Sequence, residues 1–542
     1  MIRLQKGEYV IGIDLGTTNT CAAVITYHSQ EPFIVAQRSG SRLLKSCVQF
    51  GKEVDVGENV YRRLTMGTPG IIKNSKRVLG RYFNDEIVQR CIEENQCGVE
   101  IREVDKKPIF YVNDHTPVAP SDVAAFVVKR IMEVAKEDIL DRCKEDMKCV
   151  KVAVTFPANF NNNQRTATLL AVEKAGILRE DLKMLNEPSA AAFHYCKIND
   201  INNQTILVYD LGGGTFDVSI IRVEDGDYTV LKYAGDPFLG GADFDALFAK
   251  YIERKYRNKS DTPLINSDKE KVRRRFYLRL NAIAEETKTH LSATNSYNPD
   301  LSAFGVNSED DDAEDEEDSG LQITRAELEE CIKSLIDRSI EIMEGCIADC
   351  GLTVHDIDRV VLIGGSSRLK IVEQRLETIF GKAKLSGAVN PDEAVACGAC
   401  QSLVEPLQLK DRIVYSLGQR LKGGRIQCLI PRQTQIKFTS QTLATQPSED
   451  YTTYVCAAIY QGNAEKVRDI EPQSKCDLIE DYRISGYDKT EKVNVTFLTT
   501  YTIDEWGIIN VTQKYKEKNQ ILLDTMFRWR EPVNFIPPPE EF

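Results

Sequence analysis

Two glycine-rich turns of the same design, about two hundred residues apart, are the feature that most constrains the fold of this chain. The first is Tyr9-Val-Ile-Gly-Ile-Asp-Leu-Gly-Thr-Thr-Asn-Thr20, and the second is Tyr209-Asp-Leu-Gly-Gly-Gly-Thr-Phe-Asp217. In each, a β-rich apolar run leads to Asp14 or Asp210 and then to glycines, whose missing Cβ lets backbone N–H groups close around phosphate oxygens. One such turn is usually only a tight hairpin. Two related turns predict a pair of loops that grip phosphates from opposite sides.

The charge balance argues against nucleic acid as a partner. The formal net charge is −13, and the run Glu309–Asp318 contributes nine negative charges, so the rest of the chain carries only −4. Binding a phosphate backbone requires a basic face that releases counterions, which this composition does not favour. An acidic run repels itself and buries no apolar area. We therefore interpret residues 305–320 as a solvated, disordered insertion, with an acidic docking segment as the alternative.

The alternation of strands and helices predicts an α/β domain over residues 1–405. Apolar β-rich runs such as Lys151–Phe156 and Arg359–Ile363 alternate with amphipathic helical stretches at Pro120–Lys136 and Arg325–Asp349. This rhythm is typical of strands covered by helices. Single cores stop growing near roughly 250–300 residues, so a chain of this length is expected to divide into two to four compact units.

Residues 414–520 differ in composition and in hydrophobic pattern from the preceding part, and this difference predicts an all-β domain. Thr452–Tyr460 and Val493–Leu498 are rich in β-branched residues and partly alternating, with turn residues between such runs. The change falls in residues 406–413, a short stretch of mixed polarity that predicts an interdomain linker. The prolines near the end of the chain exclude a continuous helix there, so residues 521–542 are predicted to be an extended tail.

Four acidic and basic residues suggest a chemistry for the two loops. Hydrolysis of a phosphoryl group requires that phosphates are held, Mg²⁺ is bound, the water is oriented and charge is neutralised. Asp14 and Asp210 stand at strand ends and can order the water shell of Mg²⁺, which dehydrates reluctantly. Lys76 could reach the terminal phosphate and Glu187 could orient the water, although either residue alone is far more often a solvated surface charge. The candidates for holding phosphates are Gly16, Thr17, Thr18, Asn19, Gly213, Gly214 and Thr215.

A third glycine loop is a candidate adenosine site. Ile363-Gly-Gly-Ser-Ser-Arg-Leu369 ends a buried strand and precedes a predicted helix at Ile371–Phe380. Such a turn lets the backbone approach a flat base, and Arg368 could lie across that base. The alternative is an ordinary turn between a strand and a helix.

The cysteine pattern predicts reduced thiols. The N-terminal residues predict a protein that stays in the cytoplasm or also enters the nucleus. The fifteen cysteines lack paired Cys-x-x-Cys knuckles, and the first residues lack a secretory signal. Cys397 and Cys400 form one isolated Cys-x-x-Cys in an alanine-rich run, which we interpret as small packing residues. No uninterrupted apolar segment approaches the roughly 20 residues that a bilayer requires, so we expect no membrane partner.

Four further blocks of sequence match a known family in order and spacing. They are Val154–Arg165, Leu185–Ala192, Gly235–Asp245 and Asn390–Ala396. Together with the glycine loops they make the chain similar to the heat shock protein 70 chaperone family, within the actin-like and sugar-kinase-like ATPase superfamily. The resemblance covers residues 9–404 and, more faintly, 414–520. It implies an α/β fold with a two-lobed actin-like ATPase domain, followed by an all-β sandwich domain that binds peptides.

The resemblance also implies a set of site residues. ATP or ADP with Mg²⁺ is the implied ligand, and Lys76 is implied to be essential for hydrolysis. Pro157 and Arg165 are implied to couple ATP binding to the second domain. The implied catalytic residues are Lys76, Glu187, Asp210 and Thr215, and the metal-binding residues are Asp14 and Asp210. The implied nucleotide contacts are Gly16, Thr17, Thr18, Asn19, Gly213, Gly214, Thr215, Glu285, Lys288, Ser292, Gly365, Ser366, Ser367, Arg368 and Asp392.

The chain departs from the family pattern at several positions. Thr289 stands where many eukaryotic members have an arginine beside adenine, and Asn159 stands where tyrosine is usual. The linker Leu407-Gln-Leu-Lys-Asp411 keeps two leucines but gains a lysine, so we expect weaker coupling between domains. Only residues 521–542 follow the sandwich, and at about 1.5 Å per residue they are too few for a helical lid. Bound peptide should therefore leave quickly.

The resemblance favours an ATP-dependent molecular chaperone that hydrolyses ATP to regulate its binding of unfolded or nascent polypeptides. J-domain co-chaperones and nucleotide-exchange factors are its implied partners. The alternative is a nucleotide-binding co-chaperone or ribosome-associated module with little ATP turnover. A sugar kinase would need a carbohydrate pocket and an aspartate base, and the block Val154–Arg165 counts against it.

Overall fold

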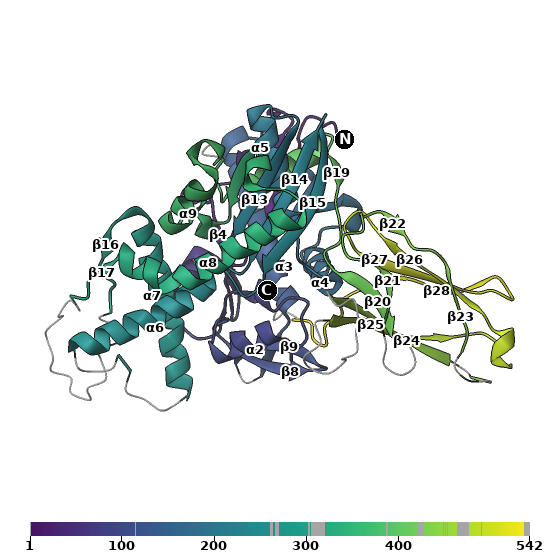
Figure 1. Ribbon diagram of the computed structural model, residues 1–542. Coiled ribbons are helices and arrows are strands. Elements are labelled where there is room, and N and C mark those ends of the chain that lie inside the picture. Colours follow the sequence, from purple (N-terminus) through teal and green to yellow (C-terminus); the bar gives the residue numbers. More distant parts are fainter. Residues whose placement is uncertain are drawn as a thin grey trace.

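The computed structural model describes residues 2–535 apart from 114, 261–263, 266–269, 302–303, 305–319, 386–388, 421–425, 448, 450, 453, 463–475 and 489. Two lobes with a cleft between them make up the first part of the chain, and a β domain lies to one side (Figure 1). Within the described residues no helix combines the length and the apolar character needed to cross a membrane.

Lobe I is organised around a sheet that carries the first glycine loop. Its main elements are β1 (Glu8–Asp14), β2 (Asn19–Thr26), β3 (Phe33–Ile34), β4 (Leu44–Lys45), α3 (Pro120–Cys143), β11 (Lys148–Phe156), α4 (Asn162–Lys174), η2 (Arg179–Asp181) and β12 (Leu182–Asn186). The strand order is β12-β11-β1-β2-β3, and β4 pairs with β2. β1 is parallel to β11 and antiparallel to β2, so the first glycine loop is the turn of a hairpin. Alternate residues of β1 face opposite sides, with Tyr9 and Ile11 packed in one core cluster and Val10 in another.

A group of smaller elements in lobe I includes the turn that brings Lys76 to the cavity. They are β5 (Val48–Phe50), β6 (Val54–Val56), α1 (Glu58–Thr65), β7 (Ile71–Ile72), η1 (Ser75–Arg77), α2 (Glu86–Glu93), β8 (Glu100–Val104), β9 (Lys107–Asn113) and β10 (Thr116–Val118). The strands form two small sheets, β6-β5-β7 and β10-β9-β8. The short turn η1 follows β7 and contains Lys76, so this part of the lobe determines where that lysine lies.

Lobe II repeats the arrangement with the second glycine loop. Its elements are β13 (Gln204–Leu211), β14 (Phe216–Glu224), β15 (Asp227–Asp236), α6 (Gly241–Ser260), α7 (Glu270–Ala293), β16 (Ser296–Tyr297), β17 (Ile323–Thr324), α8 (Arg325–Asp349), η4 (Val354–Asp356), β18 (Arg359–Ile363), η5 (Gly365–Arg368), α9 (Lys370–Phe380), η6 (Lys382–Lys384) and β19 (Gln408–Lys410). The strand order is β18-β13-β14-β15-β19. β13 is parallel to β18 and antiparallel to β14, so the second loop is also a hairpin turn.

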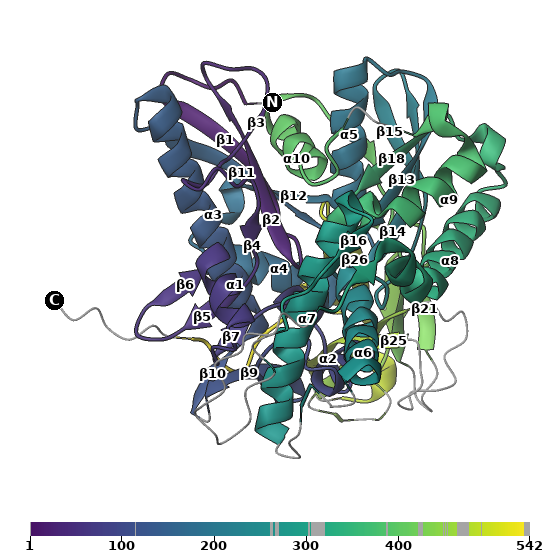
Figure 2. The ribbon, with the colours of Figure 1, turned by 90° about the vertical axis from the view of Figure 1, so that its left-hand side faces the viewer.

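Two helices, α5 (Glu187–Asn199) and α10 (Ala394–Val404), pack together between the two sheets (Figure 2). Both are rich in small residues, which lets the helix backbones approach closely. A Cβ on Gly398 of α10 would lie 1.8 Å from the carbonyl oxygen of Ala190 in α5, and a Cβ on Gly12 of β1 would lie 2.2 Å from the amide nitrogen of Cys400. Cys397 and Cys400 are buried in this packing, as the sequence predicts.

The β domain consists of two sheets around one core. Its elements are β20 (Ser416–Arg420), β21 (Ile426–Ile430), β22 (Phe438–Thr439), β23 (Leu443–Thr445), β24 (Tyr454–Gly462), β25 (Cys476–Ser485), η7 (Lys492–Asn494), β26 (Phe497–Ile503), β27 (Ile509–Tyr515) and β28 (Gln520–Met526). One sheet has the order β21-β20-β24-β25, and the other has the order β22-β26-β27-β28 with β23 paired to β26. Leu417 and Ile459 from the first sheet pack with Tyr501 and Val511 from the second, which makes a sandwich.

The structure corrects the predicted limits of the β domain. Residues 520–526 form β28, which pairs antiparallel with β27 along the edge of the second sheet. The prediction of an extended tail from residue 521 is therefore wrong as far as Met526. Within the predicted linker 406–413, Gln408–Lys410 form β19, which joins the lobe II sheet beside β15. The predicted insertion at 305–320 lies outside the described residues except for Gly320.

Residues 527–535, which we call the strap, run from the β domain onto lobe I. The amide of Trp529 donates to Oγ1 of Thr166 at 2.9 Å, and the side chain of Glu531 is almost completely buried beside Ser121 and Lys174. The amide of Phe535 donates to Oδ2 of Asp122 at 3.0 Å. These contacts fasten the β domain to lobe I, and the described residues of the strap contain no helix.

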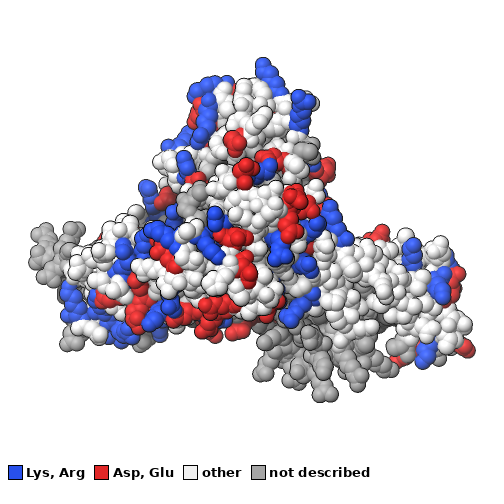
Figure 3. Space-filling model, turned by 45° about the horizontal axis from the view of Figure 1, so that its top comes forward, with Lys and Arg blue, Asp and Glu red and all other residues white. Residues whose placement is uncertain are grey.

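Acidic and basic side chains are interspersed over the face of the molecule in Figure 3. Charged side chains of the described residues also form ion pairs, such as Arg62 with Glu58 and Lys370 with Glu373. The face therefore combines both signs rather than presenting one continuous basic stripe among its described residues.

Candidate functional site

A cavity of about 500 Å³ opens between the two lobes and is lined by all three glycine loops. This volume lies within the roughly 300–1,000 Å³ usual for small-molecule sites. Ser367 belongs to the third loop but is buried, and its Oγ donates to the carbonyl of Gly364. Arg165 lies in the contact with the β domain. The other predicted site residues, which do line the cavity, are Asp14, Gly16, Thr17, Thr18, Asn19, Lys76, Pro157, Glu187, Asp210, Gly213, Gly214, Thr215, Glu285, Lys288, Ser292, Gly365, Ser366, Arg368 and Asp392.

The first two glycine loops face each other at very short range. A Cβ built on Gly213 would lie 2.2 Å from Oγ1 of Thr18, and a Cβ on Gly214 would lie 2.6 Å from Oγ1 of Thr17. No side chain fits at either position without displacing the opposite loop. Glycine is therefore required where these hairpin turns from different lobes meet.

Buried carboxylates crowd the space beside the loops. Burial raises the pKa of Asp14 to about 7, the negative charge of Glu187 adds to this rise, and Lys76 opposes it. Burial and Glu187 likewise raise the pKa of Asp217 to about 7 and that of Asp210 well above its ordinary value. Carboxylates that repel one another in a buried site are stabilised in their charged forms by a cation.

The donor set fits Mg²⁺ held partly through water. Within the described part of the chain, no group of three His, Cys, Asp or Glu side chains is placed to hold one metal ion directly. Mg²⁺ commonly keeps several of its waters and uses only one or two carboxylates. Asp14 and Asp210, from opposite lobes, supply two such carboxylates at the cavity wall.

Lys76 and Glu187 form a buried ion pair at the cavity wall. Nζ of Lys76 lies 2.8 Å from Oε1 of Glu187, and each side chain is only about a tenth exposed. Lys76 comes from η1, and Glu187 is the first residue of α5, directly after β12. A positive and a negative group are thus held together next to the two glycine loops, and neither is a solvated surface charge.

One face of α7 forms part of the cavity wall. Glu285, Lys288 and Ser292 recur at helical spacing and all line the cavity. Glu285 pairs at 2.9 Å with Lys45 of lobe I, so this contact joins the lobes. Burial raises the pKa of Glu285, but Lys45 and other nearby lysines overcome this and lower it to about 2.

Sequence reasoning did not identify Lys45 and Asp245 as cavity residues. Asp245 pairs with Lys288 at 2.6 Å, and its block Gly235–Asp245 does carry a family signal. Lys45 lies in a two-residue strand and has no local motif. Only its contact with Glu285 across the cleft reveals its place in the site.

The third loop places Arg368 at the wall of the cavity. Gly364 has a φ of 78°, in the region that favours glycine, and η5 begins at the next residue. Nε of Arg368 donates to Oδ2 of Asp392 at 2.9 Å, which holds the guanidinium at the cavity wall. Thr289 of α7 also lines the cavity, at the position where the resemblance leads us to expect arginine.

The family model described as Hsp70 protein matches residues 10–523 of the 542-residue chain. The chain belongs to the Hsp70 family. Membership supports the fold described above, an actin-like ATPase domain with a β-sandwich, and it supports a chaperone or ATPase type of function. Hsp70 proteins generally bind ATP or ADP with Mg²⁺, and they typically bind unfolded polypeptides and co-chaperones.

In this Hsp70 chain, the predicted coupling residues lie on one segment between the cavity and the β domain. Pro157 lines the cavity. The fully buried guanidinium of Arg165 donates to the carbonyls of Phe160 and Ala158 in the same segment, at 2.9 and 3.1 Å, and to that of Trp506 in the β domain at 2.9 Å. A Cβ on Gly507 would come within 2.9 Å of this guanidinium, so the fit is tight.

The start of α4 extends the Hsp70 interdomain contact. The amide of Asn162 donates to the side chain of Gln461 at 2.7 Å, and its Oδ1 accepts from the amide of Ile509 at 2.9 Å. Nδ2 of Asn163 donates to the carbonyl of Leu478 at 3.0 Å. The amides and carbonyls of two domains thus satisfy one another at this helix terminus.

Asp411 of the predicted linker is also part of the Hsp70 interdomain contact. It accepts from the hydroxyl of Tyr233 at 2.6 Å and from Nδ2 of Asn186, the residue before Glu187. Burial raises the pKa of Asp411, although these donors and Arg165 oppose the rise. The linker therefore contacts the segment that carries one of the predicted catalytic residues.

Proposed function

We propose that this protein is an ATP-dependent molecular chaperone that binds and hydrolyses ATP to regulate its grip on unfolded or nascent polypeptides. The observation that carries the proposal is the buried Lys76–Glu187 pair, next to two opposed glycine loops in the cleft. Phosphoryl transfer requires little covalent work from a protein, so holding and neutralising the phosphates is most of the task. We also propose the cytoplasm as its location, with J-domain proteins and exchange factors as partners.

Each task in hydrolysis has a residue in this arrangement. Backbone amides of the two glycine loops, with the hydroxyls of Thr17, Thr18 and Thr215, hold the phosphates. Lys76 neutralises charge that develops on the terminal phosphate, and Glu187 orients the attacking water. Mg²⁺ bound near Asp14 and Asp210 supplies further charge neutralisation.

Discrimination between states of the nucleotide follows from the same geometry. Because the two loops belong to different lobes, phosphates that contact both loops favour a closed cleft. Lys45 and Glu285, from different lobes, form an ion pair at the wall of the same cavity. Loss of the terminal phosphate removes contacts that joined the lobes, and the cleft is then free to relax.

Coupling to the β domain is the second half of the proposal. Pro157 contacts the cavity, and Arg165 in the same segment holds the carbonyl of Trp506. Asp411 ties the linker to Asn186 beside Glu187. A shift at either phosphate loop can therefore change the packing of the sandwich, and with it the affinity for peptide.

Single-turnover hydrolysis tests the enzymatic part. Radiolabelled ATP is mixed with excess protein, and the rates of the native chain and of Lys76→Ala are compared. We expect Lys76→Ala to lose roughly 100-fold or more in rate, in line with the removal of other charge-stabilising groups. Lys183→Ala, a half-buried lysine whose Nζ donates to the carbonyl of Ser402, is the matched control and should keep the native rate. Equal background rates for the native chain and Lys76→Ala would contradict hydrolysis.

The second candidate is a nucleotide-binding interaction module with little turnover. The strap favours it, because Trp529, Glu531 and Phe535 fasten the β domain to lobe I. A fixed β domain could not respond to nucleotide. Release of a fluorescent apolar peptide separates the two candidates: ATP speeds release if the domains are coupled, and leaves it unchanged if they are not.

A further inference from the structure

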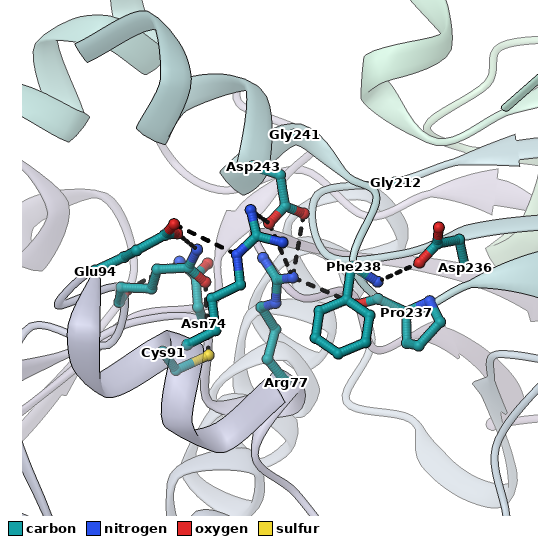
Figure 4. A network of polar contacts seen from close by, with 12 residues as sticks. Asn74, Arg77, Cys91, Glu94, Gly212, Asp236, Pro237, Phe238, Gly241 and Asp243 are labelled. Carbon is teal, nitrogen blue, oxygen red and sulfur yellow. Dashed lines mark hydrogen bonds and ion pairs between the residues drawn. The ribbon is translucent and has the colours of Figure 1, made fainter. Parts of the chain in front are cut away.

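Asp243 is a fully buried carboxylate at the contact between the two lobes, close to the second glycine loop. It belongs to the first turn of α6 in lobe II. Nη2 of Arg77 from lobe I donates to its Oδ1 and Oδ2 at 3.2 and 3.1 Å. Arg90 of α2, also in lobe I, pairs with Oδ1 at 3.3 Å. Figure 4 shows the side chain of Arg77, from η1 of lobe I, pointing toward Asp243 of lobe II.

On the lobe I side, these contacts hold the turn that carries Lys76. Arg77 is the next residue of η1, and Asn74 caps that turn in a left-handed conformation with a φ of 54°. Nδ2 of Asn74 donates to the carbonyl of Gln96 at 3.0 Å, and Nε2 of Gln96 donates to Oε2 of Glu94 at 2.7 Å. Glu94 pairs in turn with Arg90 at 3.4 Å, which leads back to Asp243. Both ends of the turn are therefore fixed by one network (Figure 4).

On the lobe II side, the same residue is linked to the second phosphate loop. The amides of Gly241 and Ala242, just before Asp243, donate to the carbonyls of Gly212 and Gly213 at 2.9 and 2.8 Å. A Cβ on Gly240 would lie 2.6 Å from the carbonyl carbon of Gly214. The start of α6, which carries Asp243, is therefore packed closely against the second glycine loop.

Burying the charges of Asp243 and Arg77 costs desolvation free energy, so stability alone does not explain why the chain has this ion pair. Well-packed apolar residues often stabilise a core as much as a buried ion pair does, whereas charged pairs can specify one arrangement. Nε and Nη1 of Arg77 are buried without a hydrogen-bond partner among the described residues, which adds to the cost. In this network, the turn that carries Lys76 is held at a set distance from the second glycine loop of lobe II.

We propose that Asp243 is a positioning residue for ATP hydrolysis, which sets Lys76 against the phosphate loop of the other lobe through Arg77 and Arg90. This inference rests on the function proposed above. The described residues that line the cavity do not include Asp243, so it acts through its partners and not on the nucleotide. A misplacement of about 1 Å can reduce a rate roughly 100-fold, so fixing this turn has a measurable value.

Three variants test the inference. Asp243→Asn keeps the shape of the side chain and removes its charge. Arg90→Gln is the milder change, because Arg90 is about a third exposed, and it carries the test if Asp243→Asn does not fold. Asp122→Asn is the matched control: Asp122 is also a buried aspartate, which pairs with Lys174 of lobe I at 2.6 Å and accepts from the amide of Phe535 in the strap.

Single-turnover rates at saturating Mg²⁺-ATP and binding of Mg²⁺-ADP are measured for each folded variant. We expect Asp243→Asn to hydrolyse roughly 10–100-fold more slowly and Arg90→Gln roughly 3–10-fold more slowly, with affinity for Mg²⁺-ADP within about threefold of native. Asp122→Asn should lose thermal stability but keep the native rate. Native rates in both Asp243→Asn and Arg90→Gln would overturn the inference, as would rate losses that follow the loss of stability in all three variants.

Hydrogen exchange without nucleotide gives a readout that does not depend on activity. The amides of Arg77 and Val78 donate to the carbonyls of Asn74 and Ser75 at 3.0 and 3.1 Å. Their exchange should accelerate in Asp243→Asn and stay native in Asp122→Asn. If the native chain shows no hydrolysis that depends on Lys76, the proposed function fails. If it does, but exchange and rate are native in Asp243→Asn, only the positioning role fails.

Discussion

Lys76 of lobe I donates to Glu187 at the start of α5 across 2.8 Å, and both side chains are buried at the wall of one cavity. The two residues are 111 positions apart in the chain. Their meeting beside the two glycine loops places a positive and a negative group together at the cavity wall, which the proposed roles on a phosphate and a water require.

Lys76 and Glu187 should act as a unit in hydrolysis. We expect Lys76→Met and Glu187→Gln each to reduce the single-turnover rate, by roughly 100-fold and 10–100-fold, and the double variant to be no slower than the slower single variant. Single-turnover rates of the four proteins measure this directly. Additive losses, with the double variant slower by the product of both factors, would show that the residues act independently.

The stability of the nucleotide-free protein should fall as pH rises. The folded-state pKa of Asp14 and of Asp217 is about 7, above the ordinary 3.8, so the folded state binds more protons than the unfolded state between about pH 4 and 7. Stability from these groups is full below pH 4 and is lost as pH rises through 7. Thermal unfolding in a chelating buffer at pH 5 to 8 measures the slope.

Asp14→Asn provides the control for this pH dependence. It removes one of the buried charges, so the variant should lose less stability than the native chain between pH 5 and 8 and should melt roughly 1–3 °C above it at pH 8. Added Mg²⁺ should stabilise the native chain more at pH 8 than at pH 5, because the carboxylates must be ionised to bind it. A native melting temperature that falls no more steeply between pH 5 and 8 than that of Asp14→Asn would contradict the account.

Arg165 should transmit the state of the nucleotide to Trp506. Arg165→Met removes the donors to three carbonyls, and each buried unsatisfied group costs about 1–3 kcal/mol. In a Trp529→Phe background, ATP should change the fluorescence of Trp506, and Arg165→Met should abolish the change. Arg179 also lies beside Trp506, 5.0 Å from its ring, but is partly exposed. Arg179→Met should therefore keep the ATP response, and loss in both variants would argue against a specific role for Arg165.

The strap should be held chiefly by Trp529. Its indole packs with Leu79 and Ala167 and edge-on against Tyr82, and truncating such a residue to alanine costs roughly 3–5 kcal/mol where its packing persists. Trp529→Ala should release the strap, so that trypsin cuts after Arg528 and Arg530 at least tenfold faster, as followed by mass spectrometry. Ile521→Ala, at an exposed position of β28, should keep the native cleavage rate. Unchanged cleavage in Trp529→Ala would mean that other contacts hold the strap.

Strong local signals explain which elements the sequence predicts well. The predicted helix Arg325–Asp349 and strand Arg359–Ile363 coincide with α8 and β18. Thr324 caps α8 in a reciprocal contact with Glu327, and Gly351 follows its end with a φ of 68°, so both ends are encoded locally. By contrast, α3 continues to Cys143, beyond the predicted Lys136, because Ile139 extends the buried face among charged neighbours.

Long-range pairing explains what the sequence does not predict. β28 is an edge strand whose side chains are exposed or half-buried. Its sequence, Gln520–Met526, therefore lacks the alternation of apolar and polar residues that marks a strand with one buried face. Only its pairing with β27 defines it. The glycine loops and Glu187 carry motifs that locate the site. Lys45 has no local motif, and the block Gly235–Asp245 carries a family signal that does not reveal which residues Asp243 contacts. The contacts of Lys45 with Glu285 and of Asp243 with Arg77 and Arg90 form only when the two lobes meet.

Titration of Mg²⁺-ATP into the purified, folded chain by calorimetry tests the central claim most directly. The two opposed loops and the crowded carboxylates predict one nucleotide per chain, with heat that is greatly reduced in Asp210→Asn and when Mg²⁺ is chelated. The absence of binding heat over several temperatures, in protein shown to be folded, would contradict the account.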